Sequence, residues 1–299
     1  MDSPGFPPTT ALRKPSRANI LRRSLTNNAV SGLAILSTIV VLAPLVAILF
    51  YLIYMGASSL NLAFFTRIPA PVGEEGGGMA NAIVGSGIIL AIASLLGIPV
   101  GVAAGVYLSE FGRGKMLGNM IRFTADVLNG VPSIVMGIAI YSLIVKQQMH
   151  YSAFAGGLAL AIMMIPTICR TTEEMLATVP HAIREAALGL GVPKWRTAIS
   201  ISLRTASPGI ITGCMLAFAR VAGETAPLLF TAFGNQFWSF KLNEPIAALP
   251  LQIFAYAISP YDEWHRLAWA GALVLIALIM VSVTLVRVFA NRGVLKGGS

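Results

Sequence analysis

The stretch that decides how this chain folds reads Ala217-Phe218-Ala219-Arg220-Val221-Ala222-Gly223-Glu224-Thr225-Ala226-Pro227. It places an arginine and a glutamate inside a run that is otherwise apolar enough to cross a membrane. A charge at the centre of a bilayer costs roughly 3 kcal/mol on insertion scales, so such residues usually face a partner or a water-filled path. The stretch therefore predicts a membrane span whose charged side chains have a specific task.

The composition of the whole chain also predicts a membrane protein. Of its 299 residues, 56% are hydrophobic and only 11% are charged, and the mean hydropathy is +0.77. A typical globular protein has about 25% charged residues. A helix that crosses a bilayer needs about 20 mostly apolar residues. We therefore predict an all-α integral membrane protein with six transmembrane helices, at residues 29–55, 80–108, 125–145, 153–169, 206–232 and 267–289.

The net charge of +9 is distributed as expected for a membrane topology and not for nucleic-acid binding. Sixteen lysines and arginines fall on the side of the membrane that holds the N-terminus and four on the other side, if the six spans are correct. Short loops rich in Lys and Arg stay in the cytoplasm. We therefore expect a multi-pass protein with both termini cytoplasmic. The cysteines and histidines lack metal-ligand spacing, and no metal site is predicted.

Three segments follow from these spans. Residues 1–28, rich in Pro, Ser, Thr and basic residues, are expected to form a flexible cytoplasmic tail. Residues 29–290 form the transmembrane domain, and residues 291–299 a second cytoplasmic tail. Within the domain, residues 170–205 make the longest cytoplasmic segment, and their pattern predicts helices.

Arg220 and Glu224 are four residues apart, which stacks them on one face of a helix. Gly223 and Pro227 predict a kink or break, since proline lacks an N–H and clashes with the preceding turn. The planar fork of arginine suits a tetrahedral oxyanion, Glu224 would hold Arg220 and balance its charge, and Thr225 would supply a hydroxyl at the break. These residues therefore indicate an anion pathway, and the alternative is a structural ion pair that pins this span to a neighbour.

Further polar and small residues mark other spans. Arg170 is expected just after the fourth span, where it would guide an anion or anchor the helix end. Asn129 and Ser133 stand four residues apart around Pro132 and would line the pore or pack. Gly97, Gly101 and Gly105 predict close helix packing and a kink in the second span.

The segment Glu185-Ala186-Ala187 with Gly191, followed by Ile201-Ser202-Leu203, resembles the EAA loop of ABC importer permeases. Arg204 replaces the proline that ends that pattern. The resemblance implies a cytoplasmic coupling helix that docks on a separate ATPase, and the alternative is an ordinary capped connector. The GxxxxGK[ST] phosphate loop is absent from the sequence, so ATP would be hydrolysed by another subunit.

Residues 220–229, Arg-x-x-Gly-Glu-Thr-Ala-Pro-Leu-Leu, are similar to the signature of the phosphate ABC-transporter permeases of the PstA type. The resemblance implies a type I ABC-importer (MetI-like) fold that takes up inorganic phosphate by alternating access in a bacterial plasma membrane. It also implies a second permease of the PstC type, two ATP-binding subunits of the PstB type and a phosphate-binding protein of the PstS type. No cofactor is expected in this chain, because ATP and Mg would be bound by the partner subunits.

Two other functions compete with this one. A permease of the same architecture for sulfate or molybdate is chemically equivalent, since all three substrates are tetrahedral oxyanions. The second alternative is a proton-coupled secondary transporter in which Glu224 titrates. An inverted internal repeat would support it, and the sequence has no convincing one. A membrane enzyme is disfavoured because the chain has no nucleophile–base pair, HExxH motif or acidic metal cluster.

Overall fold

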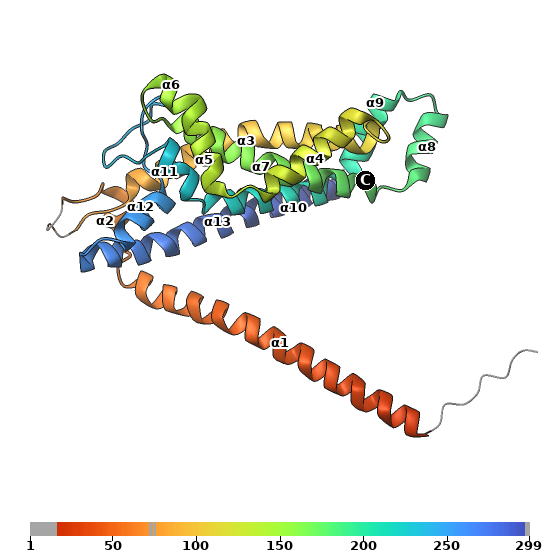
Figure 1. Cartoon of the computed structure of the whole chain (residues 1–299), viewed down its shortest axis with the longest axis horizontal. Coiled ribbons are helices and arrows are strands. Elements are labelled where there is room, and N and C mark those ends of the chain that lie inside the picture. The colour runs from red at the N-terminus through yellow and green to blue at the C-terminus, as the bar shows by residue number, and fades with distance from the viewer. Residues whose placement is uncertain (1–16, 72–73, 75, 297–299) are drawn as a thin grey trace, which may run out of the picture. The chain divides into compact units, whose positions relative to one another are not determined.

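The computed structural model describes residues 17–71, 74 and 76–296, and the regular structure in these residues is helical (Figure 1). The exception is one isolated β-bridge between Phe233 and Ile246. The prediction of an all-α protein is therefore confirmed for the part of the chain that the structure describes.

The elements follow one another along the chain as α1 (Arg17–Ala57), α2 (Leu62–Thr66), α3 (Ala80–Val106), the π-helix η1 (Tyr107–Phe111), α4 (Met116–Gly130), α5 (Ser133–Ile140), the π-helix η2 (Tyr141–Val145), α6 (Lys146–Gln148), α7 (Ala153–Ala177), α8 (His181–Gly189), α9 (Lys194–Thr197), the π-helix η3 (Ala198–Ser202), α10 (Leu203–Ala222), α11 (Ala226–Thr231), α12 (Leu249–Ala257) and α13 (Asp262–Lys296).

The described residues form two units that separate after Tyr51. The first unit is the greater part of α1, whose residues Arg22–Ala57 are long and apolar enough to cross a membrane. Residues 17–28, expected in a flexible tail, are helical, and residues 1–16 lie outside the described residues. At the other end, α13 continues to Lys296, so residues 291–296 are also helical, and 297–299 are not described.

Among the described residues, five helices are long and apolar enough to span a membrane, and a sixth crossing is made only if α4 and α5 count together. These two helices are bent by 107° at their break, so the span predicted at residues 125–145 is interrupted after Gly130 and the first of its two helices begins earlier, at Met116. The cause is Pro132, which forces Val131 into an extended conformation (ψ 131°) and ends α4 at Gly130.

The fourth and fifth spans also differ from their predicted bounds. α7 runs through Pro166 to Ala177, two turns beyond the predicted end at residue 169, so Arg170 lies inside a helix. The fifth span begins early, because α9, η3 and α10 form one continuous helix over Lys194–Ala222. The predicted break in this span is confirmed: α10 ends at Ala222 and α11 begins at Ala226.

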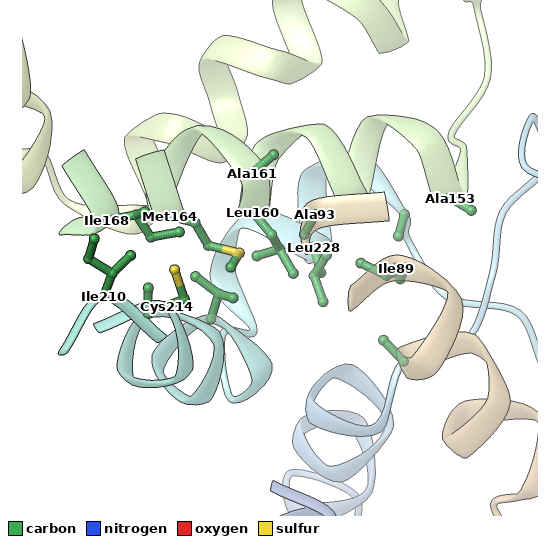
Figure 2. Close-up of a cluster of buried hydrophobic side chains, with 14 of the residues drawn as sticks. Ile89, Ala93, Ala153, Leu160, Ala161, Met164, Ile168, Ile210, Cys214 and Leu228 are labelled. Atoms are coloured by element: carbon green, nitrogen blue, oxygen red, sulfur yellow. The ribbon is translucent and has the colours of Figure 1, made fainter. Parts of the chain in front are cut away.

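α7 is the centre of the second unit and packs against α3, α4, α5, α10 and α11. Glycines let α3 approach it closely: a Cβ on Gly101 would lie 2.8 Å from the Ile168 Cβ, and one on Gly105 would lie 2.5 Å from the Thr172 Cβ. The close packing predicted from these glycines is confirmed. Figure 2 shows the apolar cluster that fills the space between the three long helices, with Ile89 and Ala93 from α3, Leu160, Met164 and Ile168 from α7, and Ile210 and Cys214 from α10.

Candidate functional site

The break between α10 and α11 is built from Gly223, Glu224 and Thr225. The last turn of α10 closes with the Glu224 N–H, which donates to the Val221 carbonyl at 3.1 Å. Pro227 lies in the first turn of α11, where its missing N–H has no intrahelical partner to lose. The chain therefore leaves one helix and starts another within three residues, as the glycine and proline predict.

Arg220 lies in the last turn of α10, and its side chain is exposed. Glu224 is half-buried and lies beyond the end of that helix, so the predicted stacking of the two on one helical face is wrong. Among the residues that the structure describes, no carboxylate lies within 4.0 Å of the Arg220 guanidinium. The negative end of the helix dipole favours a cation at this position, so the dipole and not a described carboxylate balances part of the Arg220 charge.

The two helix breaks of this unit belong to neighbouring elements. α5 packs against α11 so closely that a Cβ on Gly137 would lie 2.7 Å from the Pro227 Cα. Ser133, half-buried, begins α5, and Thr225, also half-buried, precedes α11 without making a side-chain cap. The fold therefore brings the elements that carry Ser133, Glu224 and Thr225 together, each at the start or end of a helix.

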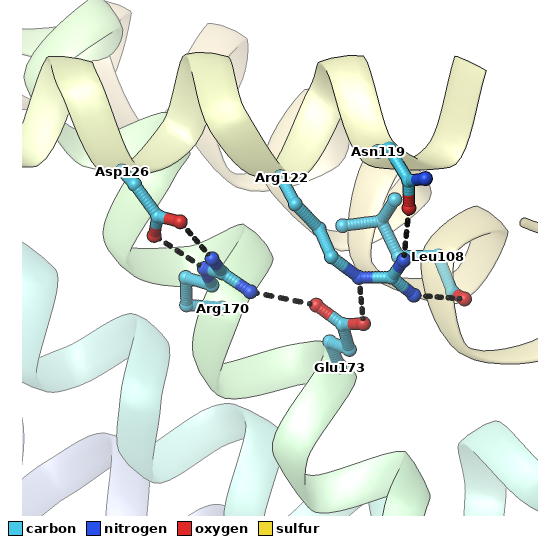
Figure 3. Close-up of polar contacts among 6 residues, drawn as sticks. All are labelled: Leu108, Asn119, Arg122, Asp126, Arg170 and Glu173. Carbon is cyan, nitrogen blue, oxygen red and sulfur yellow. Dashed lines mark hydrogen bonds and ion pairs between the residues drawn. The ribbon is translucent and has the colours of Figure 1, made fainter. Parts of the chain in front are cut away.

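Polar side chains join α4 to α7 along one line, which we call the α4–α7 seam (Figure 3). The order of its three contacts is reversed between the two helices, because successive α4 residues contact residues that lie progressively earlier in α7. Arg122 Nε donates to Glu173 Oε1 at 2.7 Å, Arg170 Nε to Asp126 Oδ1 at 2.9 Å, and Thr167 Oγ1 to Asn129 Oδ1 at 3.3 Å. The two arginines and two carboxylates give the seam no net charge.

The seam gives two predicted pathway residues structural partners. Arg170 makes a two-pronged contact with Asp126, and its third nitrogen donates to Glu173 at 3.3 Å. It lies within α7, so its expected position after the fourth span is wrong. Asn129 is exposed on α4 and bonded to α7, whereas Ser133 begins α5 across the bend, so the expected i, i+4 relation within one helix is also wrong. These contacts favour anchoring over the pathway for Arg170 and Asn129.

The segment that resembles an EAA loop forms α8 and the turn after it. Gly191 has a left-handed φ of +80°, its N–H donates to the Leu188 carbonyl, and the Val192 N–H donates to the Ala187 carbonyl. This is the Schellman arrangement, in which glycine is preferred. Ala187 is buried, while Glu185 and Ala186 are exposed. The exposed surface of the helix also carries the apolar side chains of Ile183, Leu188 and, just after it, Leu190.

Several charged residues of this architecture were missed at the sequence level. Asp126 lies inside the predicted third span, and a charge there was itself a signal of a partner. Arg122 and Glu173 lie outside the predicted spans, but each is within one helical turn of Asp126 or Arg170 along its own helix. The pair Arg184–Glu110 joins residues 74 positions apart, and no local pattern announces it.

Residues 97–293 match the family described as binding-protein-dependent transport system inner membrane component. The phosphate transport system permease protein PstA of Yersinia pestis is 47% identical over 83% of this chain and 84% of that protein. PstA 1 of Mycobacterium tuberculosis is 37% identical over 91% of each. An inward-facing structure of the MetNI methionine ABC transporter superposes with a TM-score of 0.56 at 18% identity, over 72% of this chain and 95% of that one.

The fold and the matched region define a permease of the binding-protein-dependent transport systems, with the helical architecture of ABC importers. The chain belongs to this inner membrane component family and, within it, to the phosphate transport system permeases of the PstA type. The fold class predicted from the sequence is therefore confirmed.

Proposed function

We propose that this chain is the membrane-spanning permease subunit of an ATP-driven importer that takes up inorganic phosphate by alternating access. The observation that carries the proposal is Arg220, an exposed arginine at a helix break in a membrane span, which forms no ion pair with any residue that the structure describes. The PstA relatives are named for phosphate transport, and this favours phosphate over sulfate or molybdate.

In this proposal Arg220 binds the anion at the break. Its guanidinium donates paired, charge-assisted hydrogen bonds to an oxyanion and keeps its charge throughout. The hydroxyls of Thr225 and Ser133, at the two neighbouring breaks, add neutral donors. Glu224 repels the anion and so keeps binding weak enough for release, and Gly223 and Pro227 let α10 and α11 move relative to each other.

The partners follow from the same proposal. Both termini and α8 face the cytoplasm, where the exposed surface of α8 with Glu185 and Ala186 docks on one of two ATP-binding subunits. Those subunits bind ATP and Mg, and this chain hydrolyses nothing. A second, PstC-type permease completes the pore, and a PstS-type binding protein delivers phosphate on the outer side.

Glu185→Lys is expected to weaken association with the ATP-binding subunit, because it reverses a charge on the exposed face of the coupling helix. A charged side chain at an interface of this kind contributes ~1–2 kcal/mol, which corresponds to roughly a five- to thirtyfold rise in Kd. Co-purification and titration of the two subunits in detergent measure this. Glu174→Lys is the matched control, since Glu174 is an exposed glutamate on α7 without an ion pair in the described residues. Equal losses in both variants would contradict a docking role for Glu185.

Phosphate uptake by vesicles that contain this chain, the second permease, the ATP-binding subunit and the binding protein tests the proposed function. Uptake is expected to require ATP on the side of the vesicle membrane where the ATP-binding subunits lie. It is expected to resist proton ionophores and to persist in excess sulfate or molybdate. Uptake that survives without the ATPase and collapses with the ionophore would favour a proton-coupled transporter. Loss of labelled phosphate uptake to sulfate competition would favour another oxyanion.

A further inference from the structure

Arg184 is the most highly bonded side chain of the coupling segment. Its guanidinium donates to Glu110 Oε1 from Nε at 3.0 Å and forms an ion pair with the same oxygen at 2.8 Å. It also donates to the Leu176 carbonyl at 2.6 Å, the Val179 carbonyl at 3.0 Å and Ser202 Oγ at 3.3 Å. The Arg184 side chain is 12% exposed and that of Glu110 is 8% exposed.

These partners come from three different membrane-spanning helices. Glu110 lies near the end of the helix that starts with α3, and Leu176 and Val179 lie near and just beyond the end of α7. Ser202 is the last residue of η3, inside the continuous helix that leads into α10. In the described residues, every hydrogen bond and ion pair from an α8 side chain to another element is made by Arg184. One side chain therefore provides the polar attachment of α8 to all three helices.

Two of the attachment points lie on π-helical turns. Glu110 belongs to η1 and Ser202 to η3. π-Turns are rare, and they occur often at functional sites. α9, the next helix after α8, adds a contact to η1, because the Lys194 Nζ lies over the Phe111 ring at 5.4 Å from its centroid.

We propose that Arg184 is the positioning residue that transmits the movement of the coupling helix to the membrane-spanning helices, by clamping α8 to η1, to the end of α7 and to η3. This inference rests on the proposed function, since it takes α8 as the part of the chain that an ATPase moves. When α8 shifts, the five contacts of the Arg184 guanidinium move α3, α7 and α10 with it. Without the clamp α8 moves, and the helices that hold the anion pathway do not follow.

Arg184→Gln tests this in the complete transporter, by measuring ATP hydrolysis and phosphate uptake in the same vesicles. The variant is expected to assemble and to hydrolyse ATP within about twofold of the wild-type rate. The number of phosphate ions imported per ATP is expected to fall by about tenfold, within the range of typical coupling effects. Glu110→Gln keeps the acceptor oxygen and loses only the charge, so a smaller fall in the same ratio is expected.

Arg113→Gln is the matched control, since Arg113 is exposed, lies three residues beyond Glu110 and makes no ion pair in the described residues. Its phosphate-to-ATP ratio is expected to equal that of the wild type. A normal ratio in assembled Arg184→Gln overturns the proposal. If that variant does not assemble, Glu110→Gln decides: a reduced ratio supports the clamp, and a normal ratio shows that Arg184 only stabilises the fold. A wild-type transporter that imports no phosphate would instead contradict the proposed function.

Discussion

Arg220→Gln is expected to abolish ATP-dependent phosphate uptake while the transporter remains assembled. Each charge-assisted hydrogen bond contributes about 1.5–3 kcal/mol, so losing the two parallel bonds of the guanidinium fork predicts a loss of at least about 100-fold. Assembly should survive because Arg220 is exposed and holds no ion-pair partner in the described residues. Initial uptake rates in vesicles and co-purification of the subunits measure the two effects separately.

Arg204→Gln is the control for this prediction. Arg204 lies on the same helix as Arg220, is exposed, and makes no ion pair in the part of the chain that the structure describes. Removing its charge should leave uptake within about twofold of the wild-type rate, as is usual for exposed positions away from a site. Normal transport by Arg220→Gln would show that the anion passes elsewhere and that Arg220 serves only the end of α10.

Gly105→Leu is expected to destabilise the permease by about 3 kcal/mol or more, the upper range for overpacking a tight interface. Even a Cβ at this position would lie 2.5 Å from the Thr172 Cβ and 2.7 Å from the Cys169 carbonyl oxygen. The backbone of α7 cannot yield locally, so α3 must move away from it. Thermal unfolding in detergent and the yield of folded protein measure the loss.

The same substitution at Gly87, earlier on α3, separates close packing from helix propensity. No atom lies within 4 Å of a Cβ built there, and Gly87 lines an open apolar cavity of about 360 Å³. The free energy of unfolding of Gly87→Leu should therefore lie within about 1 kcal/mol of the wild-type value. The gain in helix propensity is the same in both variants, so the difference between them reports packing. Similar destabilisation at the two positions would mean that α3 does not pack on α7 through its glycines.

The break in the fifth span could be predicted from the sequence because its causes are local. Gly223 and Pro227 act within one helical turn, through backbone freedom and a missing N–H. Gly130 and Pro132 have the same local effect, but the run around them is apolar enough to be predicted as one span. The position of a break can thus be predicted from local residues, whereas the 107° angle between α4 and α5 depends on what each helix packs against.

The pairing of charges was the weakest part of the sequence-based predictions. Spacing of four residues joins Arg220 to Glu224 only if one helix contains both, and the glycine that marks the break also ends that helix. Arg170 reaches Asp126 and Arg184 reaches Glu110 across the fold, on elements far away in the sequence. Such partners depend on which helices are neighbours, and spacing along one chain does not contain that information.

The order of charges in the α4–α7 seam has a consequence for how the permease moves. Sliding α4 by one turn along α7 would set Asp126 opposite Glu173 in one direction, and Arg122 opposite Arg170 in the other. Both displaced registers replace an attraction between opposite charges with a repulsion between like charges. We therefore expect α4 and α7 to keep this alignment and to move together. Relative motion is then expected at Val131 and Pro132, where the chain bends by 107° between α4 and α5.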